Sequence, residues 1–478
     1  MAQEPVVANA PVVANAPVVA NAEEQGDPYV LDPAKIQEPP VGWGPSLRFL
    51  GPGMITSAAV VGSGELLTAT ALGAKVGFLL LWLVLVSTFV KVAVQIELAR
   101  WSISTGRPGT LGYDDVPPRI GKRGWMSYLV ILMFLQFLTS QAGVLAAAGL
   151  AMSMLVPVAG APMSPVSVGF WVVLMVALAI AIHFTNRYSI VERVSTVLVV
   201  LVTAAVVVMV FGIQFTPFAW SGSDLADGMQ FRIAAGTMGI ALGMFGLTGV
   251  GAGEISSYSF WCVEKGYAAW TGPNDGSEEW ARRARGWVGV MKKDAWVSWV
   301  VYTLSTMAFY MLGAAVLHPQ GLEPAGNEVL KVLKRIFDDT VGGWAGGIFL
   351  VFAAVALYKT ILANVPSLSR QTAAAASLFG AFDWYDRAAR DKAMRFVMIF
   401  LPIIWGLLAV VVKSPLQMVI LGGILNALYL MGVAVATLYL SHTQTDPRIK
   451  DGKLFMVYLV ISAIAVFTVG AISLLDMF

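Results

Sequence analysis

The stretch VVGSGELL, residues 60–67, lies inside a hydrophobic segment that is long enough to cross a membrane. It contains two glycines and Glu65, where a spanning helix is ordinarily continuous and apolar. A second stretch, GVGAGEIS at residues 249–256, repeats the pattern G-x-G-E and places Glu254 in another such segment. These two acids need a physical reason, because a carboxylate in hydrocarbon costs several kcal/mol unless a partner or an ion neutralises it.

The composition is typical of a membrane protein. Of the 478 residues, 57% are hydrophobic and only 13% are charged, and the mean hydropathy is +0.73. Soluble domains are about one quarter charged. Apolar segments of the length of a spanning helix predict an all-α polytopic protein with about eleven transmembrane helices. The first of them covers roughly residues 49–74 and the sixth roughly residues 233–262.

The glycines beside each glutamate explain how the backbone tolerates the interruption. Glycine permits local unwinding, which frees carbonyl oxygens and exposes the ends of two half-helices. Interruptions at corresponding places in two halves of a chain indicate the midplane binding site of a transporter. The competing interpretation is close helix packing through glycine, with each glutamate protonated and hydrogen-bonded. The repetition favours a substrate site that consists of Gly62, Gly64, Glu65, Val250, Gly251 and Glu254.

Two domains are expected. The repeat PVVANA occurs three times from Pro5 to Ala22, and proline at every sixth residue prevents a spanning helix there. We expect residues 1–40 to be a disordered tail that carries these repeats. Residues 41–478 are then the integral membrane transporter domain.

The positive residues predict an orientation. If the N-terminus is cytoplasmic, most of the loop lysines and arginines fall on the cytoplasmic side, as the positive-inside rule requires. We expect a multi-pass protein of the plasma membrane with its N-terminus in the cytoplasm and its C-terminus outside.

One segment resembles a known family. Residues 51–106 have GP at the start, GFLLLW in the middle, and near the end Ser87, Gln95, Ala99, Arg100, Thr105 and Gly106. In these matching features they are similar to the first two helices of the Nramp divalent-metal transporters. The resemblance implies a LeuT-like 5+5 inverted repeat. It also implies that divalent cations bind where the first and sixth helices unwind.

The departures from this family change the expected chemistry. The family has Asp-Pro-Gly-Asn where this chain has Gly62, Ser63, Gly64 and Glu65, and Met-Pro-His-Asn where it has residues 251–254. Without the methionine sulfur, an oxygen site with two glutamates suits hard cations. We therefore expect transport of Mg²⁺ or Mn²⁺ by alternating access, with Glu65 and Glu254 as metal ligands. The ion is cargo, and no cofactor is expected.

Proton coupling of the usual family type is not expected. The family uses acidic residues on its third helix, where this chain has Ser140 and Gly143. Either transport is uncoupled from protons, or the two glutamates carry protons themselves, since one of two nearby carboxylates binds a proton when the cation leaves.

Three further polar residues lie inside predicted helices and are candidates for gating or charge balance. Lys359 either takes the place of the sodium ion that some LeuT-like relatives bind behind the first helix, or forms an ion pair with Glu65 or Glu254. Lys91 requires a carboxylate, a carbonyl or water as its partner. Asn426 either polarises a water beside the pore or bridges two helices.

A second class of function fits the same residues. A transporter of the same fold that carries a cationic organic solute, such as an amine or an amino acid, also has a use for paired glutamates. An enzyme is not expected, because the chain contains no catalytic motif. The expected partners are the lipid bilayer and the divalent ion, with no nucleic acid, and the sequence contains no indication of an oligomeric state.

Overall fold

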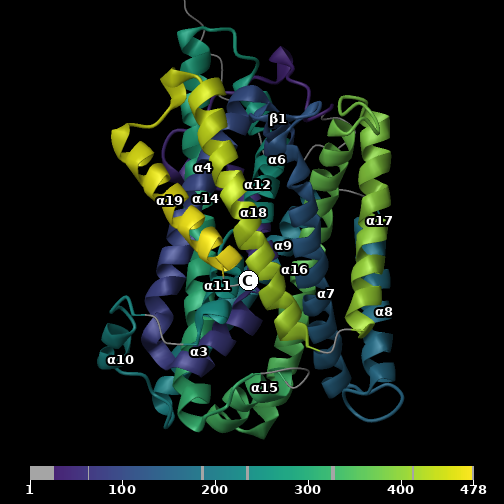
Figure 1. The fold of residues 1–478 in the computed structure, drawn as a ribbon, viewed down its shortest axis with the longest axis vertical. Helices are drawn as coiled ribbons and strands as arrows, with labels where there is room; N and C mark the ends of the chain where they lie inside the picture. Colours follow the sequence, from purple (N-terminus) through teal and green to yellow (C-terminus); the bar gives the residue numbers. More distant parts are fainter. Residues whose placement is uncertain are drawn as a thin grey trace, which may run out of the picture.

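The computed structural model describes residues 26–62, 64–184, 188–232, 236–324, 329–411 and 414–475. The chain forms an elongated bundle in which most long helices run along the long axis (Figure 1). One end carries the two-residue strands β1 (Arg119–Ile120) and β2 (Arg123–Gly124), which pair antiparallel. The other end carries the short helices α10 (Gly222–Asp227) and α15 (Val329–Thr340). We refer to these as the β1 end and the α15 end.

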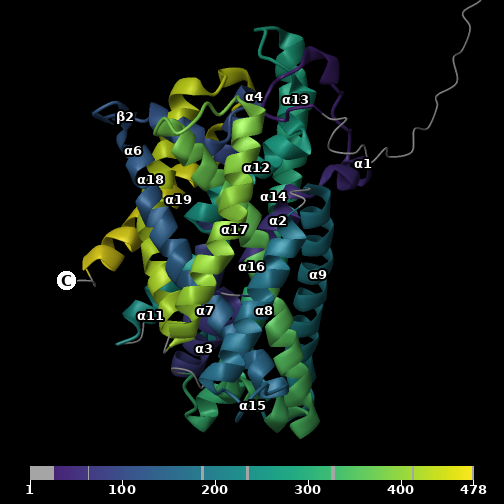
Figure 2. The same cartoon turned by 90° about the vertical axis from the view of Figure 1, so that its right-hand side faces the viewer.

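The long uninterrupted helices form most of the bundle. In chain order they are α4 (Leu81–Thr105), α7 (Val130–Leu155), α8 (Pro165–His183), α9 (Tyr188–Gly212), α14 (Glu278–Leu312), α16 (Gly343–Leu378), α17 (Arg387–Val411), α18 (Pro415–Gln444) and α19 (Lys453–Leu475). The remaining short helices are α1 (Trp43–Ser46), α5 (Gly109–Gly112), α6 (Trp125–Tyr128) and α13 (Tyr267–Thr271). Helices α8 and α17 pack together on one flank (Figures 1 and 2).

Two helices are interrupted where the sequence predicts it. The first consists of α2 (Pro52–Val60), the π-helical segment η3 (Gly64–Ala69) and α3 (Thr70–Val76). The second consists of α11 (Met238–Leu247) and α12 (Ala252–Lys265), which residues 248–251 separate. In the described parts of the chain, nine helical stretches are long and apolar enough to cross a membrane. The total of eleven spans stays a prediction, because the first of these stretches, Glu65–Thr105, includes η3 and α3 together with α4, and because α11 and α12 are each too short to be counted.

Local sequence explains where the helices begin and end. Proline, which lacks an N–H and has a helix-compatible φ, occupies the first position of α2, α8 and α18. Gly106 and Gly266 end α4 and α12 in the left-handed conformation, with φ of 70° and 114°. The first turn of α2 is capped from another helix, because Asp294 of α14 accepts from the backbone N–H of Gly51 at 2.8 Å and of Gly53 at 2.6 Å.

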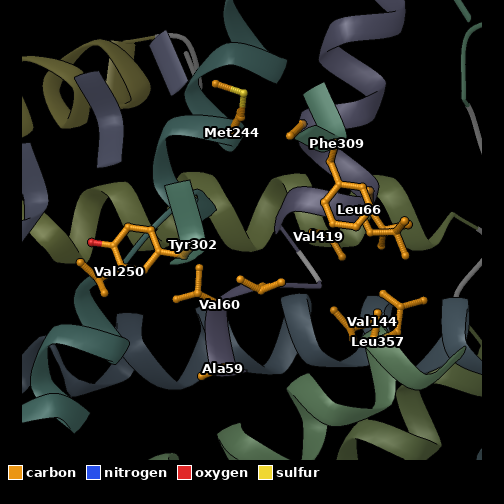
Figure 3. Packing of buried hydrophobic residues seen from close by; sticks show 14 of the residues in the cluster. Ala59, Val60, Leu66, Val144, Met244, Val250, Tyr302, Phe309, Leu357 and Val419 are labelled. Atoms are coloured by element: carbon orange, nitrogen blue, oxygen red, sulfur yellow. The ribbon is translucent and has the colours of Figure 1, made fainter. Parts of the chain in front are cut away.

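Both interruptions lie in the buried centre of the bundle. Val60 at the end of α2 and Val250 before α12 belong to the same apolar cluster as Leu66 and Tyr302 (Figure 3). Segment η3 packs against α11, α14 and α18, and α12 packs against α2, α4 and α16. The two breaks are therefore surrounded by protein, which is the condition under which unwound backbone is stable at membrane depth.

The structure differs from the expected tail at residues 26–40. Tyr29 is buried at the β1 end, where its hydroxyl donates to Glu264 at 2.5 Å and its ring packs against Trp384 with centroids 5.0 Å apart. Asp27 forms an ion pair with Arg390 at 2.9 Å. An aromatic anchor and buried charged partners hold this segment on the bundle despite its prolines. Residues 1–25, which contain the repeats, lie outside the described residues.

Candidate functional site

Glu65 is fully buried at the start of η3. Its Oε2 accepts from the backbone N–H of Gly62 at 3.0 Å, and its Oε1 accepts from the hydroxyl of Thr306 on α14 at 3.1 Å. Gly62 has a φ of 137°, and a Cβ atom there would lie 2.5 Å from the carbonyl oxygen of Ala356. Glycine is required at this position for its conformation and for the close approach of α16.

Glu254 has the same relation to its own break. It is the third residue of α12, and Gly251 is the residue that caps this helix. Its carboxylate lies against the break, because a Cβ atom on Gly251 would lie 2.7 Å from Oε2 of Glu254. Unlike Glu65, Glu254 keeps 9% of its surface accessible.

The repeated G-x-G-E pattern therefore has a local meaning. In the first break the glutamate reaches back three residues to the amide of Gly62, which is one half of a capping box, and in the second the carboxylate of Glu254 lies close to Gly251 at the same spacing. The negative side chain also lies at the positive end of the half-helix that it begins. The pattern thus restarts a helix after an interruption, and it leaves a carboxylate at the break.

Lys359, on α16, lies at the end of α2. Its ammonium donates to the carbonyl oxygens of Ala58, at 2.9 Å, and of Val61. Asn364, on the same helix, contacts the carbonyl oxygen of Ala59 at 3.5 Å. Groups of α16 therefore bind the carbonyls that the last turn of α2 leaves without a helical partner.

Lys91, on α4, has the same role at the end of α11. Its ammonium donates to the carbonyl oxygens of Phe245 and, at 2.7 Å, of Thr248. Asn426, on α18, donates to the carbonyl oxygen of Gly246 at 2.6 Å and accepts from the backbone N–H of Ala252 at 2.9 Å. Asn426 thus joins the two half-helices α11 and α12, which agrees with the bridging interpretation of this residue.

Of the two alternatives for Lys359, the direct ion pair with Glu65 or Glu254 is not present in the structure. Within the described chain, no nitrogen of Lys91 or Lys359 lies within 4.0 Å of a carboxylate oxygen of Glu65 or Glu254. The interactions are longer: Lys91 acts electrostatically on both glutamates, and Lys359 acts on Glu65. The physical reason is that the carbonyl oxygens at the ends of α2 and α11 have no helical donor, and the two ammonium groups donate to these oxygens instead of to the carboxylates.

Several polar groups near the second break were not predicted from the sequence. The amide of Gln95, the Oε1 of Gln136 and the hydroxyl of Tyr302 are buried and have no hydrogen-bond partner within the described part of the protein. Gln95 follows Lys91 by one turn on the same face of α4, which packs against α12. Tyr302 lies against Gly249, and Gln136 lies beside Gly253. Unsatisfied buried oxygens of this kind are binding positions for water or a cation.

The predicted residues are therefore gathered in two groups around one centre. Gly62 meets Glu65, and Gly251 meets Glu254 and Asn426, while Val250 packs in the apolar cluster between them. Gly64 starts η3, and Ser63 lies outside the described residues. The described residues contain no group of three or more His, Cys, Asp or Glu that could hold a metal ion. Any ion at the breaks would thus combine carboxylates with neutral oxygen donors.

The described conformation is closed around Glu65, which has no accessible surface. A cavity of about 800 Å³ opens instead at the α15 end. It is lined by residues of η4 (Gly77–Leu80), α10 and the segment around His318, and it does not reach the breaks.

A helical membrane bundle with two interrupted helices, each with an acid at its break, is a membrane transporter rather than an enzyme. A family model described as "Natural resistance-associated macrophage protein-like" (Nramp) matches residues 53–476. The chain therefore belongs to the Nramp family.

The individual relatives have low sequence identity to this chain or match only a short part of it. The uncharacterized protein PM0681 of Pasteurella multocida is 22% identical over 338 residues, which cover 69% of this chain and 70% of that protein. The divalent metal cation transporter MntH of Acidiphilium cryptum is 35% identical over 86 residues, 18% of this chain and 20% of that protein.

Solved structures show the fold. A mutant of the Eremococcus coleocola manganese transporter matches with a TM-score of 0.69 at 15% identity, with 93% of this chain and 90% of that chain covered. MhsT in complex with L-phenylalanine matches with a TM-score of 0.54 at 15% identity, with 91% of this chain and 100% of that chain covered. The chain thus has the LeuT-type transporter fold.

Proposed function

We propose that this protein transports a hard divalent cation, Mg²⁺ or Mn²⁺ first, by alternating access across the membrane. The observation that carries the proposal is the state of the two glutamates. Both lie at helix breaks in the centre of the bundle, and neither is within 4.0 Å of Lys91 or Lys359, whose donors are directed to backbone carbonyls. The carboxylates are therefore available to an ion. Family membership and the metals named for relatives support a divalent cargo.

The donor chemistry supports a hard ion. Among the described residues around the second break, the amide of Gln95, the amide oxygen of Gln136 and the hydroxyl of Tyr302 have no hydrogen-bond partner, and the carboxylate of Glu254 is partly accessible. Oxygen donors of this kind are preferred by Mg²⁺, which also keeps several of its waters. Sulfur, which favours softer metals, is absent from residues 251–254.

The charge balance supports weak rather than tight binding. Two glutamates and two lysines within electrostatic reach sum to zero formal charge, so an entering dication meets attraction and repulsion together. Weak binding is what a cargo site requires, because the ion must leave as readily as it enters.

Helix α7 holds no Asp or Glu, so proton coupling of the usual family type is not part of the proposal. Any protons that move are carried by Glu65 or Glu254. We place the protein in the plasma membrane with a cytoplasmic N-terminus, which puts the β1 end inside. The cation is the cargo, and no resident cofactor is proposed.

The test is uptake of Mg²⁺ and Mn²⁺ by purified protein in liposomes, with binding measured by calorimetry. Glu65→Gln and Glu254→Gln should each abolish saturable uptake, whereas Glu323→Gln, on the exposed surface near the α15 end, should leave it unchanged. Cd²⁺ should compete weakly. Strong preference for Cd²⁺ would overturn the hard-ion assignment. Unchanged cation binding together with altered uptake of an organic amine would instead favour a transporter of cationic organic solutes.

A further inference from the structure

The carbonyl oxygens of Ser57, Ala58 and Val61 at the end of α2 each have a hydrogen-bond donor. The helical pattern ends with the bond from the N–H of Val61 to Ser57. Beyond it, the carbonyl of Ala58 accepts from Lys359, and that of Val61 accepts from Lys359 and, at 3.3 Å, from the hydroxyl of Thr360. One ammonium therefore binds two carbonyl oxygens one turn apart, at the negative end of a half-helix.

The end of α11 has the same arrangement from a different helix. The carbonyl of Met244 accepts from the backbone N–H and the hydroxyl of Thr248, both at 2.8 Å. The ammonium of Lys91 then binds the carbonyls of Phe245 and Thr248, lies 3.4 Å from the carbonyl of Gly246 and lies 4.8 Å above the ring of Phe245. Its three donors are thus used on backbone oxygens and one aromatic face.

The carbonyls of Ala58 and Val61 form one group of oxygens and those of Phe245 and Thr248 form another. These two carbonyl clusters have the chemistry of monovalent cation sites. Unwound carbonyls at the ends of half-helices are the groups that coordinate small cations in transporters with interrupted helices. Lys91 has no accessible surface and Lys359 has 1%, so neither ammonium can reach water at the membrane surface. Among the described residues neither ammonium has a carboxylate within 4.0 Å, and backbone carbonyls are its ligands.

We propose that Lys91 and Lys359 are tethered substitutes for two monovalent cations, one at each helix break, so that the protein holds both breaks together without binding Na⁺ or K⁺ there. The two lysines come from different helices, α4 and α16, and each joins its helix to the end of a half-helix. The inference is independent of the cargo: it concerns what occupies the carbonyl clusters, whichever solute is transported.

The experiment replaces each lysine by alanine and adds a small monovalent cation to the buffer. Lys91→Ala and Lys359→Ala are purified, and their thermal unfolding midpoints are measured in choline chloride and then in NaCl, KCl or methylammonium chloride at equal ionic strength. Wild-type protein should unfold at the same temperature in all four salts. Each variant should unfold several degrees lower in choline and regain much of the loss, saturably, in at least one small cation. Choline is too large to enter the clusters.

Lys334→Ala is the matched control, because Lys334 is paired with Asp338 on α15, away from the breaks. It should show no difference between the salts. Lys91→Ala and Lys359→Ala variants that lose stability equally in every salt would overturn the proposal and leave the lysines as packing residues. If the alanine variants do not fold in any salt, Lys91→Met and Lys359→Met are measured instead, because methionine keeps the length of the side chain. A higher unfolding midpoint in a small cation than in choline supports the proposal. Equal midpoints in all salts overturn it.

Discussion

The carboxylate of Glu65 is hydrogen-bonded to the backbone amide of Gly62, three residues before it, at 3.0 Å. The same step separates Gly251 from Glu254 at the second break. Glu65 therefore caps the restart of its own helix, and Glu254 lies in the first turn of α12, where a negative charge is stabilised by the helix dipole. A local role and a role in binding cargo are compatible for Glu65, because a carboxylate has four lone-pair positions and the amide of Gly62 and the hydroxyl of Thr306 use only two.

Replacing Gly62 tests how closely the first break is packed. In Gly62→Ala the new Cβ would lie 2.5 Å from the carbonyl oxygen of Ala356 and would hold a φ of 137°. We expect a loss of about 2–4 kcal/mol in the free energy of unfolding, from strain and overpacking together. Gly169→Ala, in α8 with open space around it, should be neutral or slightly stabilising. Equal thermal midpoints for the two variants would contradict the close approach of α2 and α16.

Asn426 should be important for stability. Asn426→Leu leaves the amide of Ala252 without its partner and leaves the carbonyl of Gly246 only the 3.4 Å contact with Lys91, at a cost of about 1–3 kcal/mol. Thermal unfolding in detergent measures the loss. Thr437→Val, on the same helix, removes only a local bond to the carbonyl of Val433 and should cost clearly less. The bridge between α11 and α12 is absent if Asn426→Leu is as stable as Thr437→Val.

Removal of the charge of Lys91 should strengthen cation binding. Lys91 acts on both glutamates, so Lys91→Met removes a repulsion felt by an entering dication. We expect the dissociation constant for Mg²⁺ to fall by about tenfold, an electrostatic change of about 1.4 kcal/mol. Calorimetry in choline medium avoids competition from small cations. Lys334→Met should not change the affinity, and unchanged or weaker binding by Lys91→Met would show that the ion binds beyond the reach of this lysine.

The single cysteine reports on the β1 end. Cys262 lies in α12 and is fully buried, so a maleimide should react with it slowly. Tyr29→Ala removes the aromatic anchor that packs beside Trp384 and the donor to Glu264. We expect the rate of Cys262 modification to rise severalfold as this end opens more often. Tyr385→Phe, an exposed control at the same end, should not alter it. A rate that Tyr29→Ala leaves unchanged would mean that the N-terminal segment does not restrain α12.

The interruptions could be predicted from the sequence because their cause is local. Glycine and glutamate at fixed spacing define both the unwinding and the restart of the helix, and neither depends on a distant partner. The G-x-G-E pattern was therefore sufficient to place Glu65 and Glu254 at the breaks, although not to show that Glu65 caps its own helix.

The partners of the lysines could not be predicted in this way. The sequence leaves open whether Lys359 takes the place of a sodium ion or pairs with a carboxylate, and it does not identify the ligands of the ammonium, which are the carbonyls of Ala58 and Val61, about 300 positions away in the chain. Because every residue has a backbone carbonyl, the sequence does not show which carbonyls will bind a given lysine. Tyr29 was missed for a similar reason, because its partners Glu264 and Trp384 are brought to it only by the fold.

The capping of α2 by Asp294 has a mechanical consequence. The same carboxylate holds the amides of Gly51 and Gly53 and also accepts from the hydroxyl of Tyr258 on α12 at 2.9 Å. Three elements are thereby pinned at one point near the β1 end. A rotation that exposes the centre from this side would therefore move α2, α12 and α14 together as one rigid unit. Movement of α2 alone would require its hydrogen bonds to Asp294 to break first.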